Sequence, residues 1–292
     1  MVPTETVHGL AADGTNGKAI ARIFEAKGRP RFNPLIAHVA DVGMAEDLAL
    51  LDDRARALAT AFWPGPLSLV LPLRELSPIH PLATAGLGTV ALRVPRGSLQ
   101  ELSLRLDRPL VAPSANRSGK VSPTRTAHVM GDLAPHLDPA RDVVLGDNGG
   151  GVGIGVESTI VTLAGEKPVL LRPGGIARTA IEQLLGSRLK LPSDGAVVAP
   201  GMLASHYAPK GSVRLNVETP EAGEFFIAFG PTDRFDAQLS ASRDMNEAAR
   251  NLFAALHTAN AVGADRIAIA PIPGEGVGEA INDRLRRAAA PR

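Results

Sequence analysis

The alternation of short apolar runs with amphipathic runs through the first 190 residues constrains the fold of this chain more than any other feature. Residues 35–39 form a short apolar run, whereas residues 17–27 place Ile20, Ile23 and Phe24 at the spacing of one helix face. Strands that alternate with helices in this way are typical of α/β domains. The sequence therefore predicts an α/β fold with a twisted, mixed sheet in its first part.

Periodicity and turn residues define the individual elements that we expect. Residues 89–95 alternate strictly, so Val90, Leu92 and Val94 share one side of a strand and Arg93 lies on the other. Strands are expected over residues 35–39, 68–73, 89–95, 110–112, 143–145, 158–163 and 169–172, and helices over residues 17–27, 45–62, 97–105, 126–133 and 177–185.

Three regions follow one another along the chain. Periodicity disappears over residues 190–210, which predicts a linker or lid between two domains. Residues 1–189 form the larger α/β domain, which starts so abruptly that we expect an amino-terminal strand and helix to be missing from it. Residues 211–292 form a smaller, Rossmann-like α/β domain, with strands over 213–217, 225–229 and 266–272 and helices over 245–261 and 278–289.

Composition excludes several classes of protein. The net charge is +1, so no overall field attracts nucleic acid or an anionic membrane, and 3% aromatic residues leave few stacking partners for single-stranded RNA. The absence of cysteine excludes disulfides, thiolate nucleophiles and cysteine-ligated zinc, and it fits a reducing compartment. With no secretion signal and no apolar run of about 20 residues, we expect a cytoplasmic protein without membrane spans.

Common nucleotide and metal motifs are absent from the sequence. Residues 147–155 are glycine-rich but do not spell G-x-G-x-x-G and lead into a strand, which excludes a Rossmann dinucleotide loop there. This run is either a flexible surface loop or a turn that lines a site, and its neighbour Ser158 favours the turn. The seven histidines lack metal-ligand spacing, so no protein-bound transition metal is expected, whereas Mg²⁺ carried by a substrate is allowed.

Two cations stand between the first expected helix and the next strand. Gly28 is a natural helix terminator, so Lys27 stays near the last carbonyl groups while the guanidinium of Arg29 lies beyond the helix. Such a pair either complements the helix dipole or holds a phosphate. Other polar side chains near strand ends each fit a cap or turn alone, but together they favour a pocket for a polyphosphate and a small polar partner. They are Thr4, Thr6, His38, Thr89, Arg93, Ser114, Asn116, Ser122, Ser158 and Arg172.

A series of short motifs resembles the YrdC-like threonylcarbamoyl-AMP synthase family. The motifs are Pro3-Thr4-Glu5-Thr6-Val7, Lys27-Gly28-Arg29-Pro30, Asn33-Pro34-Leu35, Trp63-Pro64-Gly65-Pro66, Pro113-Ser114-Ala115-Asn116, Glu157-Ser158-Thr159 and Leu171-Arg172-Pro173-Gly174. The run Ser205-His206-Tyr207-Ala208-Pro209 resembles the linker of the longer, two-domain branch. The resemblance implies a YrdC-like catalytic domain that converts L-threonine, bicarbonate or CO₂, and ATP into threonylcarbamoyl-adenylate and pyrophosphate.

The resemblance also implies roles for individual residues. Lys27 and Arg29 would be the catalytic cations. His8 departs from the usual Tyr of the family and would place a smaller, titratable ring at the pocket wall. Threonine would contact Thr6, His38, Arg93, Ser158 and the backbone at Ala112, and ATP would contact Arg29, Asn33, Thr89, Ser114, Asn116, Ser122 and Arg172, with Tyr207 covering the nucleotide as part of a lid.

The implied partners are small molecules and a downstream enzyme. Mg²⁺ would enter with ATP, and the product would pass to a separate tRNA threonylcarbamoyl-transferase complex that modifies adenosine 37 of ANN-decoding tRNAs. One rival is an RNA-binding module with a basic cavity and no catalysis, which the near-zero net charge disfavours, although weak binding of double-stranded RNA or tRNA stays compatible. Another is a carbamoyl-transfer domain of hydrogenase maturation factors, which the linker at residues 205–209 disfavours.

Overall fold

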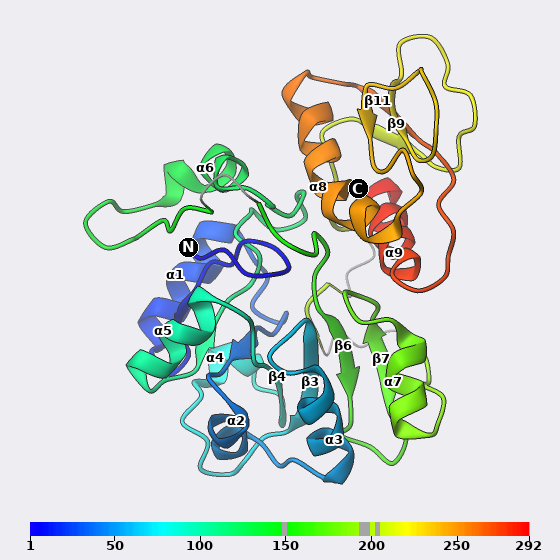
Figure 1. The fold of residues 1–292 in the computed structure, drawn as a ribbon. Helices are drawn as coiled ribbons and strands as arrows, with labels where there is room; N and C mark the ends of the chain where they lie inside the picture. Colours follow the sequence, from blue (N-terminus) through cyan, green and yellow to red (C-terminus); the bar gives the residue numbers. More distant parts are fainter. Residues whose placement is uncertain (148–150, 193–198, 202–204, 292) are drawn as a thin grey trace.

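Two β-sheets organise the chain (Figure 1). The computed structural model describes residues 1–147, 151–192, 199–201 and 205–291. The first sheet has seven strands in the order β1-β5-β2-β4-β3-β6-β7, and the second has four in the order β10-β9-β11-β8. The first sheet contains both parallel and antiparallel neighbours, which confirms the predicted mixed α/β fold.

The first sheet and its helices occupy residues 12–185. Its strands are β1 (Ala12–Asp13), β2 (Ile36–His38), β3 (Leu67–Pro72), β4 (Thr89–Arg93), β5 (Leu110–Val111), β6 (Thr159–Thr162) and β7 (Val169–Arg172). Its helices are α1 (Gly17–Lys27), α2 (Val42–Leu48), α3 (Asp53–Phe62), α4 (Pro81–Thr84), α5 (Ser98–Leu106), α6 (Thr126–Leu133), a 3₁₀ turn (Ala134–His136) and α7 (Arg178–Leu185).

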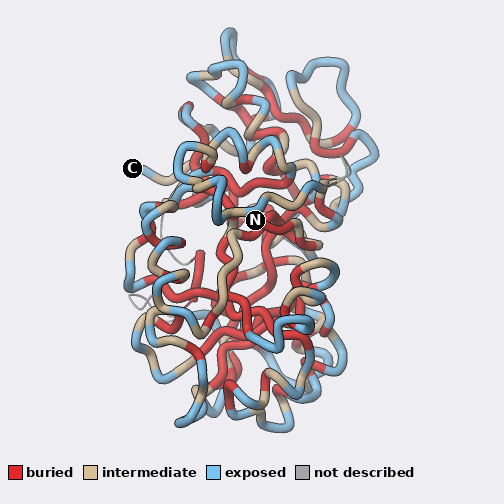
Figure 2. Tube along the Cα trace, turned by 90° about the vertical axis from the view of Figure 1, so that its left-hand side faces the viewer, coloured by how far each residue is buried: buried red, intermediate tan, exposed pale blue. Residues whose placement is uncertain are grey.

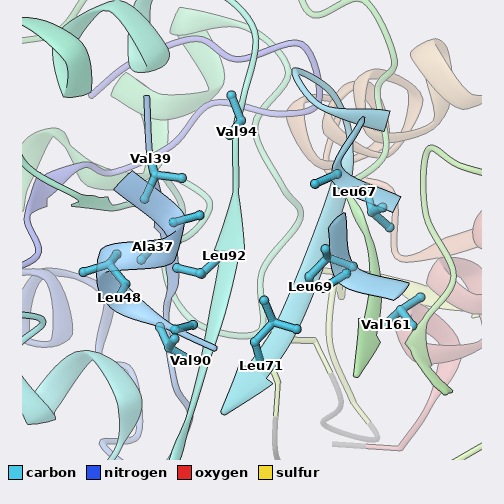
Figure 3. Close-up of a cluster of buried hydrophobic side chains, with 14 of the residues drawn as sticks. Ala37, Val39, Leu48, Leu67, Leu69, Leu71, Val90, Leu92, Val94 and Val161 are labelled. Atoms are coloured by element: carbon cyan, nitrogen blue, oxygen red, sulfur yellow. The ribbon is translucent and has the colours of Figure 1, made fainter. Parts of the chain in front are cut away.

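One face of this sheet holds the largest hydrophobic core. Because successive side chains of a strand point to opposite faces, alternate residues of β3 and β4 meet on this face. Figure 3 shows Leu67, Leu69 and Leu71 of β3 facing Leu92 of β4, with Val161 of β6 close to them. Helices α1 to α4 and α7 contribute further buried residues to the same core.

The other face of the sheet is apolar in its middle and polar at one end. Ile36, Val70, Ala91 and Ile160 form a small apolar cluster there. In the parallel pair β2 and β4, His38 lies directly opposite Arg93 in register. This register places an imidazole and a guanidinium side by side at the carboxyl ends of the two strands.

The second sheet is parallel throughout and carries its helices on one face. Its strands are β8 (Ser212–Arg214), β9 (Phe225–Ala228), β10 (Ala237–Gln238) and β11 (Arg266–Ile269), and its helices are α8 (Met245–Ala261) and α9 (Gly278–Ala289). In Figure 1 both helices lie between this sheet and the first part of the chain. Residues of α8 and α9 share a core cluster with Val7, Val156 and Tyr207, so the two parts are in direct contact. Figure 2 shows buried segments running through the interior of both parts, with exposed segments outside.

The structure corrects two of the predicted elements. The single helix expected over residues 45–62 is two helices, α2 and α3, because Asp52 caps α3 by accepting from the amide of Ala55 and Ala49 is extended. The strand expected over residues 143–145 is absent from the described structure there, since Val143 and Leu145 bond to Met1 instead of to a sheet strand. The short elements β1, β10 and α4 escaped prediction because two to four residues carry no periodicity.

Within the described ranges, the helices are too short or too polar for any of them to span a membrane.

Candidate active site

A cavity of about 60 Å³ lies where the polar end of the first sheet meets the chain segment around Tyr207. The loop before β1, the turn after α1 and the ends of β2, β4 and β6 all contribute to its wall. Ten of the residues that the sequence singles out line it: Thr4, Thr6, Arg29, His38, Arg93, Ala112, Ser114, Ser158, Arg172 and Tyr207. These residues span 204 positions of the chain, from 4 to 207, so only the tertiary fold assembles them.

Arg93 is held on one side of the cavity by residues of the amino-terminal loop. Its guanidinium is 2.7 Å from a carboxylate oxygen of Glu5, and it donates to the hydroxyl of Thr6 at 3.2 Å and to the carbonyl of Gly65 at 3.1 Å. Thr6 in turn shares a hydrogen bond of 2.9 Å with Thr4. Arg93 is 4% exposed, so this paired cation is fixed within the wall of the cavity.

His38 is buried next to Arg93 and is neutral at physiological pH. Burial, followed by the charge of Arg93, lowers the pKa of His38 to about 3. Its Nδ1 has no hydrogen-bond partner among the described residues, although the side chain is only 2% exposed. A buried polar atom without a partner is costly, so this nitrogen is suited to bind a ligand.

Arg29 occupies the turn after α1, on a different side of the cavity. Gly28 adopts φ +57° and ends the helix, and its neighbour Arg29 then turns back to donate to Oδ1 of Asn33 at 2.7 Å and to the carbonyl of Pro34 at 2.8 Å. Burial, together with the charge of Arg172, lowers the pKa of Arg29 to about 10, so the guanidinium keeps its charge at neutral pH. Within the described ranges, Arg29 has no carboxylate at ion-pair distance.

Arg172 ends β7 and crosses to the end of β6. Its guanidinium donates to the carbonyl of Ser158 at 2.9 Å and to the hydroxyl of the same residue at 3.2 Å, and to the carbonyl of Pro200 at 3.3 Å. The Ser158 hydroxyl also shares a hydrogen bond of 2.8 Å with Ser68. As for Arg29, neutral oxygens provide the hydrogen-bond partners of Arg172 in the described structure. Two of the three cavity arginines are therefore available to balance the charge of an anion.

Comparisons with known proteins identify the family of this chain. The family profile described as "Telomere recombination" matches residues 1–174, and the profile "Threonylcarbamoyl-AMP synthase, C-terminal domain" matches residues 176–290. The chain belongs to the threonylcarbamoyl-AMP synthase family. The enzyme of that name from Pyrococcus abyssi is 40% identical over 98% of this chain and 89% of its own length, and the one from Bacillus subtilis is 38% identical over 99% and 89%.

A solved structure of the family has the same fold over nearly the whole chain. The crystal structure of Pyrococcus abyssi Sua5 complexed with L-threonine has a TM-score of 0.87 and 38% identity, and it covers 98% of this chain and 89% of its own. The structure of a variant of the same protein, in which an adjacent His and Tyr are both replaced by Ala, has a TM-score of 0.84. These matches include both sheets, so the two-part architecture is the one found in the long branch of the family.

Five of the residues expected to bind substrates do not line the cavity. Lys27 is 2% exposed and donates to the carbonyls of Ser114 and Asn116 instead of to the end of its own helix, so it orders the segment that carries Ser114. Thr89 begins β4, about 13 Å along the strand from Arg93 at roughly 3.3 Å per residue. Asn33, Asn116 and Ser122 are buried behind the wall and bond to protein groups.

Two other expectations about the cavity wall are corrected. His8 lies behind the wall, 1% exposed, with Nε2 3.6 Å from a carboxylate oxygen of Asp147. Burial lowers the pKa of His8, and Asp147 opposes that effect. Of the glycine-rich run, residues 148–150 lie outside the described residues. Residues 151–155 do not line the cavity, although the amide of Ile154 donates to the carbonyl of Glu5, the partner of Arg93.

Two charged or titratable residues of the cavity wall, Glu157 and His206, were not identified from the sequence. Glu157 directly precedes Ser158 in the chain. His206 precedes Tyr207 in the linker, and burial lowers its pKa to about 3. The motifs that contain them were visible, but a motif does not say which of its members points into a cavity.

No group of three or more His, Asp or Glu side chains suited to a metal occurs among the described residues.

Proposed function

We propose that this chain is a threonylcarbamoyl-AMP synthase, which joins L-threonine, bicarbonate and ATP into threonylcarbamoyl-adenylate and releases pyrophosphate. The convergence of Arg29, Arg93 and Arg172 on one cavity carries this proposal. The net charge of the protein is only +1, so its overall field does not attract anions. Three guanidiniums at one cavity create a local site for an anion instead. Relatives that bear this enzyme name share both parts of the chain.

Threonine would bind on the side of the cavity that holds Arg93. The guanidinium and the hydroxyls of Thr6 and Ser158 suit a carboxylate and a small alcohol, and the free Nδ1 of His38 suits a further polar atom of the amino acid. The backbone at Ala112 completes this side. The Pyrococcus relative that was crystallised with L-threonine supports this choice of amino acid.

ATP would bind on the side that holds Arg29 and Arg172, with Ser114 at the wall. The threonine amine attacks CO₂ with loss of a proton, or bicarbonate with loss of water, to form a carbamate. A carbamate oxygen then attacks the α-phosphate while the bond between the α-phosphate and pyrophosphate breaks. Negative charge therefore grows on the phosphoryl oxygens and on the leaving group, where fixed cations stabilise the transition state. Lys27 and Asn33 would act from behind the cavity wall. Lys27 positions the segment that carries Ser114, and Asn33 positions Arg29.

Tyr207 would act as part of a lid over the nucleotide. A cavity of about 60 Å³ is well below the roughly 300–1,000 Å³ of typical ligand sites, so ATP needs the covering segment to move. Gly201 is tightly packed at this place, because a side chain added to it would lie 2.9 Å from Arg172 and 3.0 Å from the hydroxyl of Tyr207. Closure over bound substrates then keeps water from the carbamate and the acyl-adenylate.

The remaining partners follow from the same reaction. Mg²⁺ would arrive on the nucleotide and screen its phosphates, without ligands from the protein. The adenylate would pass to a tRNA threonylcarbamoyl-transferase complex in the cytoplasm. A basic, non-catalytic RNA-binding module is the alternative function. It is less well supported, because the cavity arginines are buried and a polymer needs an exposed basic surface.

The test is a pyrophosphate-release assay with the purified full chain. Release is expected only when ATP, threonine and bicarbonate are all present, and omission of any one should remove the signal. A mass-spectrometric peak for threonylcarbamoyl-adenylate identifies the product. Turnover that continues without threonine, or threonine-independent binding of RNA as the sole activity, would contradict the proposal.

A further inference from the structure

A single guanidinium from the carboxy-terminal helix is buried against the back of the cavity. Arg284 of α9 is 0% exposed, and its Nε donates to Oε2 of Glu157 at 2.7 Å. Its two other nitrogens donate to the carbonyl of Pro173 at 3.0 Å and to a carboxylate oxygen of Asp283 at 2.6 Å. Glu157 and Pro173 are the chain neighbours of Ser158 and Arg172, so Arg284 fixes the two turns that carry cavity residues.

Glu157 is an unexpected group in a cavity for phosphates. It lines the cavity, is 6% exposed, and its second oxygen accepts from the hydroxyl of Ser122 at 2.6 Å. Burial raises the pKa of Glu157, but the charges of Arg284 and Arg172 and the hydrogen bond from Ser122 outweigh burial, so the pKa lies below its usual value. The side chain is therefore an anion, and an unbalanced anion in this wall would repel a polyphosphate.

The charges of two arginines, Arg284 and Arg172, act on Glu157, but of these two only Arg284 donates a hydrogen bond to it in the described structure. Arg284 makes the direct contact, whereas Arg172 donates to the Ser158 and Pro200 oxygens on the cavity side. If Arg284 were absent, Arg172 would be the remaining cation whose charge acts on Glu157. A charged hydrogen bond between these two residues would then compete with any bond from Arg172 to a ligand.

The same guanidinium also supports the residue above the cavity. Its central carbon is 5.2 Å from the centre of the Tyr207 ring, which is a cation–π contact. Tyr207 is further packed against Phe253 of α8, with ring centres 5.5 Å apart. Arg284 of the second domain thus contacts both Glu157 in the cavity wall and Tyr207.

We infer that Arg284 is a positioning residue for the nucleotide side of the cavity: it neutralises Glu157, so that Arg172 stays available for phosphates, and it supports Tyr207. The inference rests on the proposed function only for the identity of the anion, ATP. It assigns to the second domain a defined part in forming the site. Arg284 itself contacts no substrate in this arrangement.

Four variants of the full chain separate charge balance from packing: Arg284→Met, Glu157→Gln, the double variant, and Arg286→Met as a control at an exposed position of the same helix. ATP affinity is measured by calorimetry without threonine, and KM is measured for each substrate. Arg284→Met should raise the Kd and KM of ATP about tenfold or more, with less than about a threefold change in the KM of threonine. Arg286→Met should match the unaltered chain.

The double variant gives the decisive comparison. If Arg284 acts by balancing Glu157, the double variant binds ATP within about threefold of Glu157→Gln, because the carboxylate that would capture Arg172 is gone. If the double variant is as weak as Arg284→Met, the role of balancing Glu157 is overturned, and if Arg284→Met binds ATP normally, the whole inference is overturned. Should Arg284→Met fail to fold, the double variant and Glu157→Gln alone still decide the role of balancing Glu157, since a tenfold weaker double variant overturns it.

The two proposals fail in different ways. A chain that releases no pyrophosphate, but whose ATP affinity follows the expected order of variants, contradicts the proposed function and leaves the role of Arg284 intact. A chain that makes threonylcarbamoyl-adenylate while Arg284→Met retains the same KM for ATP supports the function and removes Arg284 from the site.

Discussion

The two sheets of this protein differ in what they bury. At the polar end of the first sheet, His38, Arg93, Ser158 and Arg172 are all less than 9% exposed. In the second domain, the buried polar side chains of the described residues are Ser240, Asp283 and Arg284, and none of them lies on a strand. Burying polar groups is costly, so their concentration at one sheet end indicates a ligand site there. The second domain is an ordinary apolar α/β unit whose buried guanidinium is directed at the first domain.

The sharpest way to break this comparison is to remove a buried cation from the first region and an exposed cation from the second. Arg29→Ala deletes a cavity guanidinium that lacks a carboxylate partner in the described structure, so we expect turnover to fall by about 100-fold or more. Arg266→Ala removes an exposed cation at the start of β11 in the second sheet, and turnover should change less than about twofold. Steady-state pyrophosphate release measures both.

Arg31→Ala is the matched control for Arg29→Ala, because Arg31 is exposed on the same turn. It should retain full activity. Equal losses in Arg29→Ala and Arg266→Ala would show that the two regions do not differ as their burial indicates.

A smaller effect is expected at the boundary between the two regions. Tyr207 is 1% exposed and packs between Arg284, Phe253 and the cavity. Tyr207→Ala should weaken ATP binding about tenfold by removing the cover over the nucleotide, and truncating a buried ring also lowers the free energy of unfolding by roughly 3 kcal/mol.

Tyr207→Phe separates these two consequences, because it keeps the ring and its packing. Calorimetry gives the affinity and urea unfolding gives the stability. If Tyr207→Ala bound ATP as tightly as the unaltered chain, the segment around residue 207 would not be a lid.

Local sequence patterns predicted the framework of the first domain well. Alternation over residues 89–95 correctly placed Arg93 opposite the apolar side of β4, and Gly28 correctly marked the end of α1. The same alternation could not separate the two ends of a strand, so Thr89 was grouped with Arg93 although it lies at the other end. Periodicity shows on which face of a strand a residue lies, but not how far along the strand that residue is from a site.

Long-range contacts explain the rest of what the sequence left open. Lys27 bonds to carbonyls 87 and 89 residues away, and Arg284 bonds to Glu157 across 127 residues. No local pattern encodes such pairs, since a buried charge and its partner become neighbours only when distant parts of the chain are packed together. For this reason the motifs indicated a cation-lined pocket but not which cation would face the ligand.

The smallest expected effect concerns acid stability, and it sharpens the contrast between the regions. His38 and His206 are buried in the cavity, and burial is the largest cause of lowering the pKa of each from 6.5 to about 3. Below pH 6.5 the unfolded chain therefore binds protons that the folded chain does not, so stability is complete above that pH and falls as the pH drops towards 3. As the pH falls within that window, each histidine lowers the free energy of unfolding by about 1.4 kcal/mol per pH unit.

His38→Asn should make the decline of the unfolding free energy between pH 6 and pH 4 shallower by roughly this amount, as measured by urea titrations at several pH values. His136→Asn, at an exposed position of the 3₁₀ turn, is the matched control. Because His38 lies in the first sheet and His206 lies beside Tyr207 at the cavity, hydrogen exchange at pH 5 should accelerate first in β2 and its neighbour β4. A decline of unchanged slope in His38→Asn would mean that this imidazole is already charged in the folded protein.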